Sequence, residues 1–478
     1  ALARIAAGHF STRDFTIDRL RAALQTYVLE FPVYRTYVTA AGAADGDRKM
    51  IEETIARARA RWAGPDPEIF DFLRDALNID LAANTGYSAT RVRNFALKLQ
   101  QFTGPLMAKA LEDTTFYRHH RLLALNEVGG DPTAEALSLN EFSDLQAKRA
   151  ETAPSGLTAS ATHDTKRGED ARARILALSE IPTEWESAVR NWQGKNVRLI
   201  AQLNGRRCPS AGHEYMLYQA LIGAWPATID ESFVSRLGKY ALKAAREGKQ
   251  ETSWTNPNEA YEAGLQAFVR RLLDPQTSRE FLASFAEFAA RTALLGALNG
   301  LSQLALKALL PGVPDFYQGT EFWDTSLVDP DNRRPVDFKQ RASALASGET
   351  NWATLASQWQ DGQIKFALTR DLLGVRRKFA DLLRSGSYEP LDVTGRDAAH
   401  VIAFTRTLRR EQVVVAIGRH FAPLTDGGRR WPAEFEAGLQ IPSNTEFESV
   451  LGENIPSQTG ANLVVAFTHI PVSVWRRV

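Results

Sequence analysis

The sequence has few cysteines, no long apolar run and almost no net charge, and each of these absences excludes a class of protein. Cys208 is the single cysteine, so no disulfide can form within the chain, and this suits a reducing compartment such as the cytoplasm. No run of about 18 apolar residues occurs, and residues 1–10 have neither the basic flank nor the apolar length of a signal peptide. Lys plus Arg (57) nearly cancels Asp plus Glu (56), which leaves no overall field to attract nucleic acid or an anionic membrane. We therefore expect a cytoplasmic protein whose ligand is uncharged or bound locally.

Length and composition indicate a globular chain of more than one domain. At 478 residues, the sequence exceeds the size at which a single hydrophobic core stops growing, so two or three domains are expected. Hydrophobic residues make up 44% and charged residues 24%, which is close to the average of globular proteins and excludes wholesale disorder. The chain does not begin with methionine, and we expect that the gene product begins further upstream.

Hydrophobic periodicity predicts two long helical regions. Apolar residues recur at intervals of three to four from Ile17 onward, and helix is predicted over most of residues 14–126. Helix is predicted again over most of residues 181–310. Within this region, Asn256 before Pro257 is expected to cap a helix that begins in TNPNEAYEAG.

Two short strands are predicted between the helices, and a β-rich tail follows them. The small and β-branched residues of SGLTASATHD, residues 155–164, predict a strand that carries His163 and Asp164 at its end. The apolar run in GVPDFY predicts a second strand over residues 313–317. From residue 387 onward, the alternating segments HVIAFTRTL, QVVVAIGRH, NLVVAFTHI and PVSVWRRV predict a small β domain.

The first polar cluster is ATHDTKRGEDARAR, which places His163 and Asp164 at a predicted strand end, just before Lys166 and Arg167. In barrel folds the C-terminal ends of the strands meet at one site, so side chains placed there can contact a bound substrate. The His-Asp pair alone is not specific, because a hydrogen-bonded turn or a helix cap explains the dipeptide equally well.

A second polar cluster lies in TGPLMAKALEDTTFYRHHR. It consists of Lys109, Glu112, Asp113, Tyr117 and Arg118. On a helix, spacings of three and four bring Lys109 near both carboxylates, and an ordinary surface ion pair is the favoured interpretation from spacing alone.

A third cluster, EFWDTSLVDPDNRRPVDF, has the composition of a functional loop after a strand and carries Trp323, Arg333 and Arg334. In the alternative interpretation the two arginines form ion pairs within a surface loop, with Asp329, Asp331 or Asp337. Aromatic planes suit the apolar face of a pyranose ring, and several tryptophans are candidates for such stacking. They are Trp192, Trp225, Trp254, Trp323 and Trp352, of which only Trp323 lies in a polar cluster.

Together, these clusters resemble the α-amylase superfamily, glycoside hydrolase family 13, and within it the maltooligosyl trehalose synthase branch. The segments FPVYRTYV, TGPLMAKALEDTTFYR, LLALNEVGGDP, ATHDTKR, SWTNPNEAYE and GVPDFYQGTEFWDTSLVDPDNRRPVD resemble that branch in the same order along the chain. The resemblance implies an isomerase of trehalose biosynthesis. It would convert the terminal α-1,4 bond at the reducing end of a maltooligosaccharide into an α,α-1,1 bond, without a metal ion or a cofactor.

The resemblance also implies the fold, which is α/β: the C-terminal part of a (β/α)8 TIM barrel with large helical insertions, followed by a small antiparallel β domain. We expect a series of segments along the chain. They are a helical subdomain at 1–98, a barrel segment with the catalytic seventh strand at 99–180, a helical insertion at 181–300, the last barrel strand and helix at 301–386, and the β domain at 387–478.

The matched motifs imply roles for single residues. Asp164 resembles the third catalytic carboxylate of the superfamily, which stabilises an oxocarbenium-like transition state. His163 resembles the histidine that hydrogen-bonds the sugar beside the cleaved bond. The motifs imply that a larger set of residues binds the substrate. It comprises Lys109, Glu112, Tyr117, Lys166 and Arg167 on the side of the acceptor glucose, Arg333 and Arg334 on the non-reducing side, and Asp113, Arg118 and Trp323.

One departure from the family pattern bears on activity. A retaining member needs a nucleophilic Asp in a Gly-x-Arg-x-Asp-like segment and a general-acid Glu, and neither pattern occurs in the sequence. We therefore expect both residues in an N-terminal part outside this sequence, and we expect the fragment alone to be inactive. It should pair with that N-terminal half or dimerise, because half a barrel exposes strand edges. A maltooligosyl trehalose trehalohydrolase is a further expected partner in the pathway.

Three alternatives remain open. A metal-dependent phosphohydrolase of the His-Asp type would use His163, Asp164 and the pair His119 and His120, but the chain has only eight histidines for such a site. Another α-amylase-superfamily hydrolase or glucanotransferase fits the shared motifs. A glucan-binding fragment without activity fits the lack of a nucleophile and an acid.

Overall fold

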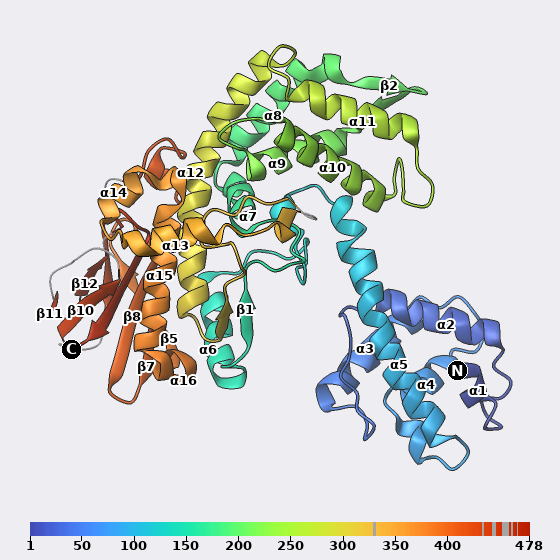
Figure 1. Ribbon diagram of the computed structural model, residues 1–478. Coiled ribbons are helices and arrows are strands. Elements are labelled where there is room, and N and C mark those ends of the chain that lie inside the picture. The colour runs from blue at the N-terminus through green and yellow to red at the C-terminus, as the bar shows by residue number, and fades with distance from the viewer. Residues whose placement is uncertain (328–330, 433–434, 442–445, 452–457, 460–461, 466) are drawn as a thin grey trace. The chain divides into compact units, whose positions relative to one another are not determined.

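The computed structural model describes residues 1–327, 331–432, 435–441, 446–451, 458–459, 462–465 and 467–478. The chain divides into two compact units, Ala1–Thr115 and Phe116–Val478 (Figure 1). The finer division that the sequence suggests stays a prediction, and its boundary at residue 98 falls inside helix α5 (Ala89–Met107) of the first unit. Asp329 and several stretches of the predicted β domain lie outside the described residues.

The first unit is helical, as the periodicity predicts. Its helices are α1 (Leu2–Ala6), α2 (Ile17–Glu30), α3 (Asp45–Ala60), α4 (Ile69–Leu77) and α5, with a 3₁₀ turn at Asp80–Ala83. Thr16 caps α2, because its side chain accepts a hydrogen bond from the Arg19 N–H. The apolar faces of the helices pack into one core that includes Phe70 and Leu73. A π-helical turn, Ala108–Glu112, extends α5 directly into the second polar cluster.

The second unit is built around one long helix. Its helices are α6 (Leu139–Thr152), α7 (Glu169–Leu176), α8 (Pro182–Asn196), α9 (Ala211–Ala224), α10 (Glu231–Gly248), α11 (Glu259–Leu272), α12 (Arg279–Leu309), α13 (Phe338–Ser347), α14 (Trp352–Ser357), α15 (Gln363–Lys378) and α16 (Ala380–Ser385). Helix α12, yellow in Figure 1, packs against α7, α8 and α9, and also against α15 and strand β8 of the C-terminal domain. It therefore connects the cores on its two sides.

Helix α12 is the one described helix that is long and apolar enough to cross a membrane by length and composition alone. More than half of its most apolar window, 56%, is buried inside the protein, as is usual for a core helix.

Two short strands form a parallel pair. β1 (Leu157–Ala159) pairs with β4 (Val313–Asp315), with Thr158 opposite Pro314. Both predicted strands are confirmed, although each is shorter than the sequence indicated. His163 and Asp164 lie beyond the end of β1 rather than within it. A separate hairpin joins β2 (Ala201–Leu203) to β3 (Arg206–Cys208).

The C-terminal region forms antiparallel sheets, as predicted. One sheet has the strand order β11-β10-β13-β8-β7-β5, and a smaller sheet has the order β12-β9-β6. The strands are β5 (Ser387–Pro390), β6 (Val393–Thr394), β7 (Val401–Leu408), β8 (Glu411–Gly418), β9 (Ala437–Gln440), β10 (Glu446–Leu451), β11 (Gln458–Thr459), β12 (Asn462–Val465) and β13 (Val472–Arg477). Figure 1 shows them together in orange and red at the C-terminal end. The protein is therefore a mixed fold of helices and strands with a small antiparallel domain.

The predicted cap of helix α11 is wrong by two residues. Asn258, not Asn256, caps the helix, and its side-chain oxygen accepts a hydrogen bond of 3.2 Å from the Tyr261 N–H. Pro257 consequently lies before the helix. Both asparagines are suitable caps by residue type, and the loop that precedes the helix decides between them.

Candidate active site

The parallel pair brings two of the polar clusters together. Because β1 and β4 run in the same direction, the segments that follow them leave from the same edge. Residues 160–170 follow β1, and residues 316–337 follow β4. The two segments then pair through a bridge between Arg167 and Leu327. Regions that are more than 150 residues apart in the sequence thus form one site.

The turn that carries His163 and Asp164 is exposed. The Thr162 hydroxyl accepts a hydrogen bond of 3.1 Å from the Asp164 N–H, and the Thr165 hydroxyl donates one of 3.0 Å to the Thr162 carbonyl. The Arg333 guanidinium donates to the His163 carbonyl at 3.2 Å. Among the described residues, the carboxylate of Asp164 has no hydrogen bond and no ion pair. The backbone of this turn is therefore fixed, while its carboxylate is available to a ligand.

Directly after this turn, the chain enters a buried network of charges. Lys365 of α15 is fully buried, and its ammonium group donates to Glu169 at 2.7 Å and to Asp170 at 2.6 Å. Lys307 of α12 lies 3.4 Å from the other oxygen of Glu169, and the Ser160 hydroxyl also donates to it. Asp170 accepts a 2.7 Å hydrogen bond from the Asp324 N–H. The network thus ties the first turn of α7 to the loop after β4.

The two carboxyl groups of the network differ in pKa: that of Glu169 is lowered and that of Asp170 is raised. Burial alone would raise the pKa of Glu169, but the charges of Lys365 and Lys307 hold it at about 2. Burial raises the pKa of Asp170 to about 6, although Lys365 acts in the opposite direction. Lys365, despite its burial, has a raised pKa because the two carboxylates favour its charged form. The cluster is therefore held together by Lys365 and the Glu169 carboxylate.

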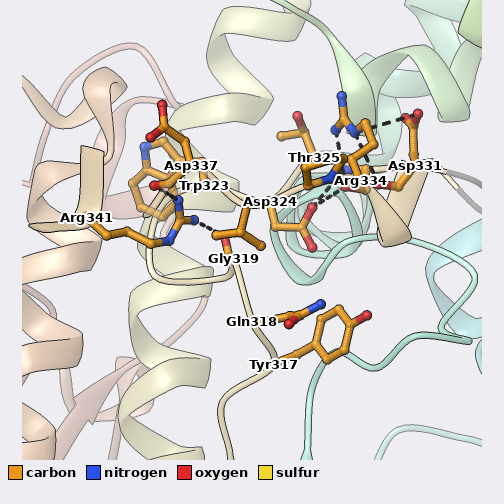
Figure 2. Close-up of a pocket in the computed structure, with 13 residues that line it drawn as sticks. Tyr317, Gln318, Gly319, Trp323, Asp324, Thr325, Asp331, Arg334, Asp337 and Arg341 are labelled. Atoms are coloured by element: carbon orange, nitrogen blue, oxygen red, sulfur yellow. Dashed lines mark hydrogen bonds and ion pairs between the residues drawn. The ribbon is translucent and has the colours of Figure 1, made fainter. Parts of the chain in front are cut away.

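The loop after β4 encloses a pocket of about 260 Å³. Figure 2 shows Trp323, Asp337 and Arg341 on one side of it and Arg334 and Asp331 on the other, with Asp324 between them. Tyr317 and Gln318 lie below. The predicted residues Trp323 and Arg334 thus line this pocket, whereas His163 and Asp164 do not. With carboxylates, guanidinium groups and an indole ring, the pocket presents both hydrogen-bonding groups and an apolar face.

The side chains around this pocket are held in place. Trp323 donates to the Trp359 carbonyl at 2.8 Å, and the Lys365 ammonium lies 5.8 Å from the centre of its ring. Arg334 donates to the Asp331 carbonyl at 3.1 Å. The ion pairing that was the alternative interpretation of the arginines is present here, since the Arg334 guanidinium also lies 3.9 Å from the Asp331 carboxylate.

Lys166 and Arg167 are both buried, with 5% of their surface exposed. The Lys166 N–H donates to Glu127 at 2.7 Å. The Arg167 guanidinium donates to the Leu123 carbonyl and to the Tyr240 hydroxyl, each at 3.1 Å. In this structure Arg167 therefore braces the segment that follows the His-Asp turn.

The second cluster is divided between the two units. In the first unit Lys109 forms an ion pair with Asp113, four residues along, and Tyr34 donates a hydrogen bond to Glu112. This is the i,i+4 pair that spacing favoured. In the second unit Tyr117 is buried, and Arg118 donates to the Gly248 carbonyl at 2.5 Å.

Several residues of the site escaped the sequence analysis. Glu127, Glu169, Asp170 and Lys365 form hydrogen bonds and ion pairs directly after the turn. Glu127 also pairs with Arg172 at 3.2 Å. The motifs LNEVGGDP and KRGED contain three of these residues, but nothing in the local sequence marks Lys365.

The described residues contain no group of three or more His, Cys, Asp or Glu side chains that could hold a metal ion. His120 lies 3.0 Å from the Tyr117 carbonyl, and its ring is 5.8 Å from that of His213. His120 thus contacts a carbonyl and another ring rather than carboxylate side chains, which gives no support to the phosphohydrolase alternative.

Known proteins resemble this chain in sequence and in structure. No family model matches the chain. A curated relative from Mycobacterium tuberculosis, named "Putative maltooligosyl trehalose synthase", is 36% identical over 385 residues, which are 79% of this chain and 45% of the relative. The solved maltooligosyltrehalose synthase from Arthrobacter ramosus is 30% identical with a TM-score of 0.77, and the match covers 100% of this chain and 56% of that one. A hypothetical maltooligosyl trehalose synthase from Sulfolobus tokodaii is 26% identical with a TM-score of 0.69, over 100% of this chain and 58% of that one.

These matches first define a class of proteins. The chain has the α-amylase-like fold of glycoside hydrolase family 13, whose members act in carbohydrate metabolism. It spans about half the length of the relatives that it matches. Within the class, the proteins that the chain matches over most or all of its own length are maltooligosyl trehalose synthases. The resemblance found in the sequence motifs is thereby confirmed.

Proposed function

We propose that this chain carries the transition-state-stabilising carboxylate of a maltooligosyl trehalose synthase. The enzyme would be an isomerase that turns the terminal α-1,4 bond of a maltooligosaccharide into an α,α-1,1 bond by intramolecular transglucosylation. The observation that carries the proposal is the exposed His163–Asp164 turn at the end of a parallel strand, in a chain that matches these synthases. We place the enzyme in the cytoplasm, where a maltooligosyl trehalose trehalohydrolase would act on its product.

Asp164 would act on the sugar at the bond that is cleaved. A retaining reaction passes through an oxocarbenium-like state, and a fixed carboxylate that is hydrogen-bonded to ring hydroxyls stabilises that charge. Asp164 suits this role, because its exposed carboxylate has no partner among the described residues to lose on binding. His163 would hydrogen-bond the same sugar, and Arg333 would position the turn through the His163 carbonyl.

The chemistry requires that the released glucose stays in the site. If water reacted first with the glycosyl-enzyme, the outcome would be hydrolysis, so the captured glucose must present its anomeric hydroxyl at high effective concentration. We propose that Tyr117, Arg118, Lys166 and Arg167 of the second unit hold it. In the first unit, Lys109, Glu112 and Asp113 are proposed as further substrate-binding residues on the basis of the matched motifs.

The pocket in the loop after β4 would bind glucose units on the non-reducing side. Trp323 offers a ring that is fixed by its hydrogen bond to Trp359, and fixed aromatic planes suit the apolar face of a pyranose. Arg334 lines the same pocket, and the adjacent Arg333 reaches the His163 turn. Together they would join the pocket to the bond-breaking position.

The nucleophilic Asp and the general-acid Glu would lie on chain outside residues 1–478. We propose that β1 and β4 are the seventh and eighth strands of a TIM barrel, which the remaining strands close. Its own N-terminal half would therefore be the essential partner of this chain.

Incubation of the purified chain with maltopentaose tests the proposal. The chain alone should form no α,α-1,1-linked product by proton NMR, whereas a polypeptide extended upstream in the gene to include the N-terminal half should form it. Product from the 478 residues alone would contradict the division of catalytic residues. If the extended polypeptide formed no such product, two alternatives would remain: release of glucose or of shorter glucans would favour another hydrolase or glucanotransferase, and unchanged maltopentaose would favour a glucan-binding protein without activity.

A further inference from the structure

Trp254 stands apart from the other tryptophans of the chain. All ten tryptophans lie in the described residues, and Trp254 is the only one in the exposed class, with 53% of its surface accessible. It lies in the loop between α10 and α11. No aromatic ring among the described residues packs on it. A large indole ring exposed in this way is the kind of surface that sugars and proteins bind.

One face of this indole is supported by a fixed cation. The Arg246 guanidinium carbon lies 4.8 Å from the centre of the Trp254 ring. Glu262 of α11 holds Arg246 by two hydrogen bonds, of 2.8 and 2.5 Å. The Thr252 hydroxyl donates to the same carboxylate at 2.6 Å. The ring therefore has one covered face and one face open to solvent.

Hydrogen bonds also order the loop that carries the ring. The Thr252 hydroxyl accepts from the Asn258 N–H at 2.9 Å, next to the cap of α11. The Ser253 hydroxyl accepts from the Asn256 N–H at 3.0 Å, and the Ser253 N–H donates to the Asn256 carbonyl at 3.2 Å. A ring that is ordered before binding loses little conformational entropy when a ligand stacks on it.

The surroundings of Trp254 select the class of ligand. Residues 254–260 are all exposed, and apart from Trp254 they are small or polar, TNPNEA. In α10, α11 and the loop between them, Trp254 is the only large apolar side chain that is exposed. A protein interface would need further apolar anchors around the ring. A single ring with a polar rim instead matches a pyranose, which has one apolar face and hydroxyl groups at its edge.

We propose that Trp254 is a stacking platform for one glucose unit of an α-1,4-glucan, separate from the His163–Asp164 turn. The choice of a glucan rests on the proposed function. The loop is joined to the second polar cluster, because Arg118 donates to the carbonyl of Gly248, the last residue of α10. The platform would thus bind a glucan on the same unit as Arg118, which is itself proposed to contact sugar.

Isothermal titration of the 478-residue chain with maltoheptaose tests this platform. Trp254→Ala should weaken binding about fivefold to tenfold, since one stacked ring is lost, and Trp254→Tyr should recover part of the loss. Phe10→Ala is the matched control, because Phe10 is an exposed aromatic side chain of the first unit, and it should bind like the unchanged chain. Thermal unfolding of each variant checks that the fold is kept.

The results separate this inference from the proposed function. Equal affinities for the unchanged chain and Trp254→Ala, or no measurable binding of maltoheptaose by the unchanged chain, would overturn the platform. Asp164→Asn should retain the Trp254-dependent difference in affinity. An extended polypeptide that forms no α,α-1,1-linked product would refute the synthase activity and leave that difference as it is.

Discussion

Two neighbouring stretches of the same segment differ sharply in their surroundings. His163 and Asp164 are exposed, whereas residues 165–171 are all buried. The buried stretch is fixed from several sides. Glu169 and Asp170 bind Lys365, and the N–H groups of Gly168 and Asp170 donate to carbonyl groups of the loop after β4.

The difference shows that the buried residues are held rigidly, whereas the exposed residues can be reached by a ligand. A carboxylate that must meet a developing positive charge needs a fixed position but no competing partner. The buried residues supply the fixed position through the backbone, and the exposed carboxylate of Asp164 is available to a sugar. Changes in the exposed pair should therefore affect activity, and changes in the network of Glu169 and Asp170 within the buried stretch should affect stability.

The largest expected effect is on activity. In the extended polypeptide, Asp164→Asn should lower the rate of α,α-1,1 product formation about 100- to 1000-fold, because a charged stabiliser of the transition state is lost. Its free energy of unfolding should change by less than about 0.5 kcal/mol, since the side chain is exposed. Asp381→Asn, at an exposed carboxylate of α16, is the control and should leave the rate unchanged. An unchanged rate in Asp164→Asn would contradict the functional difference proposed between the exposed pair and the buried stretch.

The next effect is on stability. Lys365→Met should lower the free energy of unfolding by about 3 to 5 kcal/mol, because it leaves two buried carboxylates with too little positive charge. Lys378→Met on the same helix is the control, because that lysine is exposed, and it should change stability by no more than about 0.5 kcal/mol. Urea unfolding measures both. Equal effects of the two substitutions would contradict a structural role of the buried network.

The pH dependence of stability sharpens the comparison further. The pKa of Glu169 is lowered to about 2 by its lysines, so the folded state binds a proton there less readily than the unfolded state. Its contribution to stability is therefore fully present above about pH 4.5 and is lost as the pH falls towards 2. Glu169→Gln should remove this contribution, so that unfolding curves of the variant and the unchanged chain differ at pH 6 and converge near pH 2. A constant difference over this range would contradict it.

The sequence was informative where structure is local. Segments rich in apolar and β-branched residues predicted β7 and β8, and the small and β-branched residues before His163 predicted β1. Strands β9 and β10 were missed, because AGLQ and EFESVL are short and carry weak alternation. The cap of α11 was misplaced since two asparagines compete within three residues, and the side-chain hydrogen bond with the Tyr261 N–H identifies Asn258 as the cap.

The candidate site was predictable only in part, for a similar reason. Family motifs marked His163 and Asp164, and the parallel pairing of β1 and β4 brought Arg333 to them. Lys365, in contrast, is almost 200 residues from its partner carboxylates, Glu169 and Asp170, and it lies in an ordinary amphipathic helix. Its partners depend on how α15 packs against the rest of the unit, which no local pattern encodes.

The smallest expected effect is on stability. It concerns Gly168, where the segment after β1 lies close to the loop after β4. A Cβ added there would lie 2.4 Å from the Asp324 carbonyl oxygen, so Gly168→Ala must push the loop after β4 away from α7. We expect a loss of about 1 to 3 kcal/mol in the free energy of unfolding. Gly374→Ala on α15 is the opposite control, because a Cβ there meets nothing within 4 Å, and it should stabilise the helix by about 0.4 to 1 kcal/mol. Thermal unfolding separates the two. If both variants gained stability, the contact between the buried stretch and the loop would not be tight, and the fixed position proposed for Asp164 would lose its support.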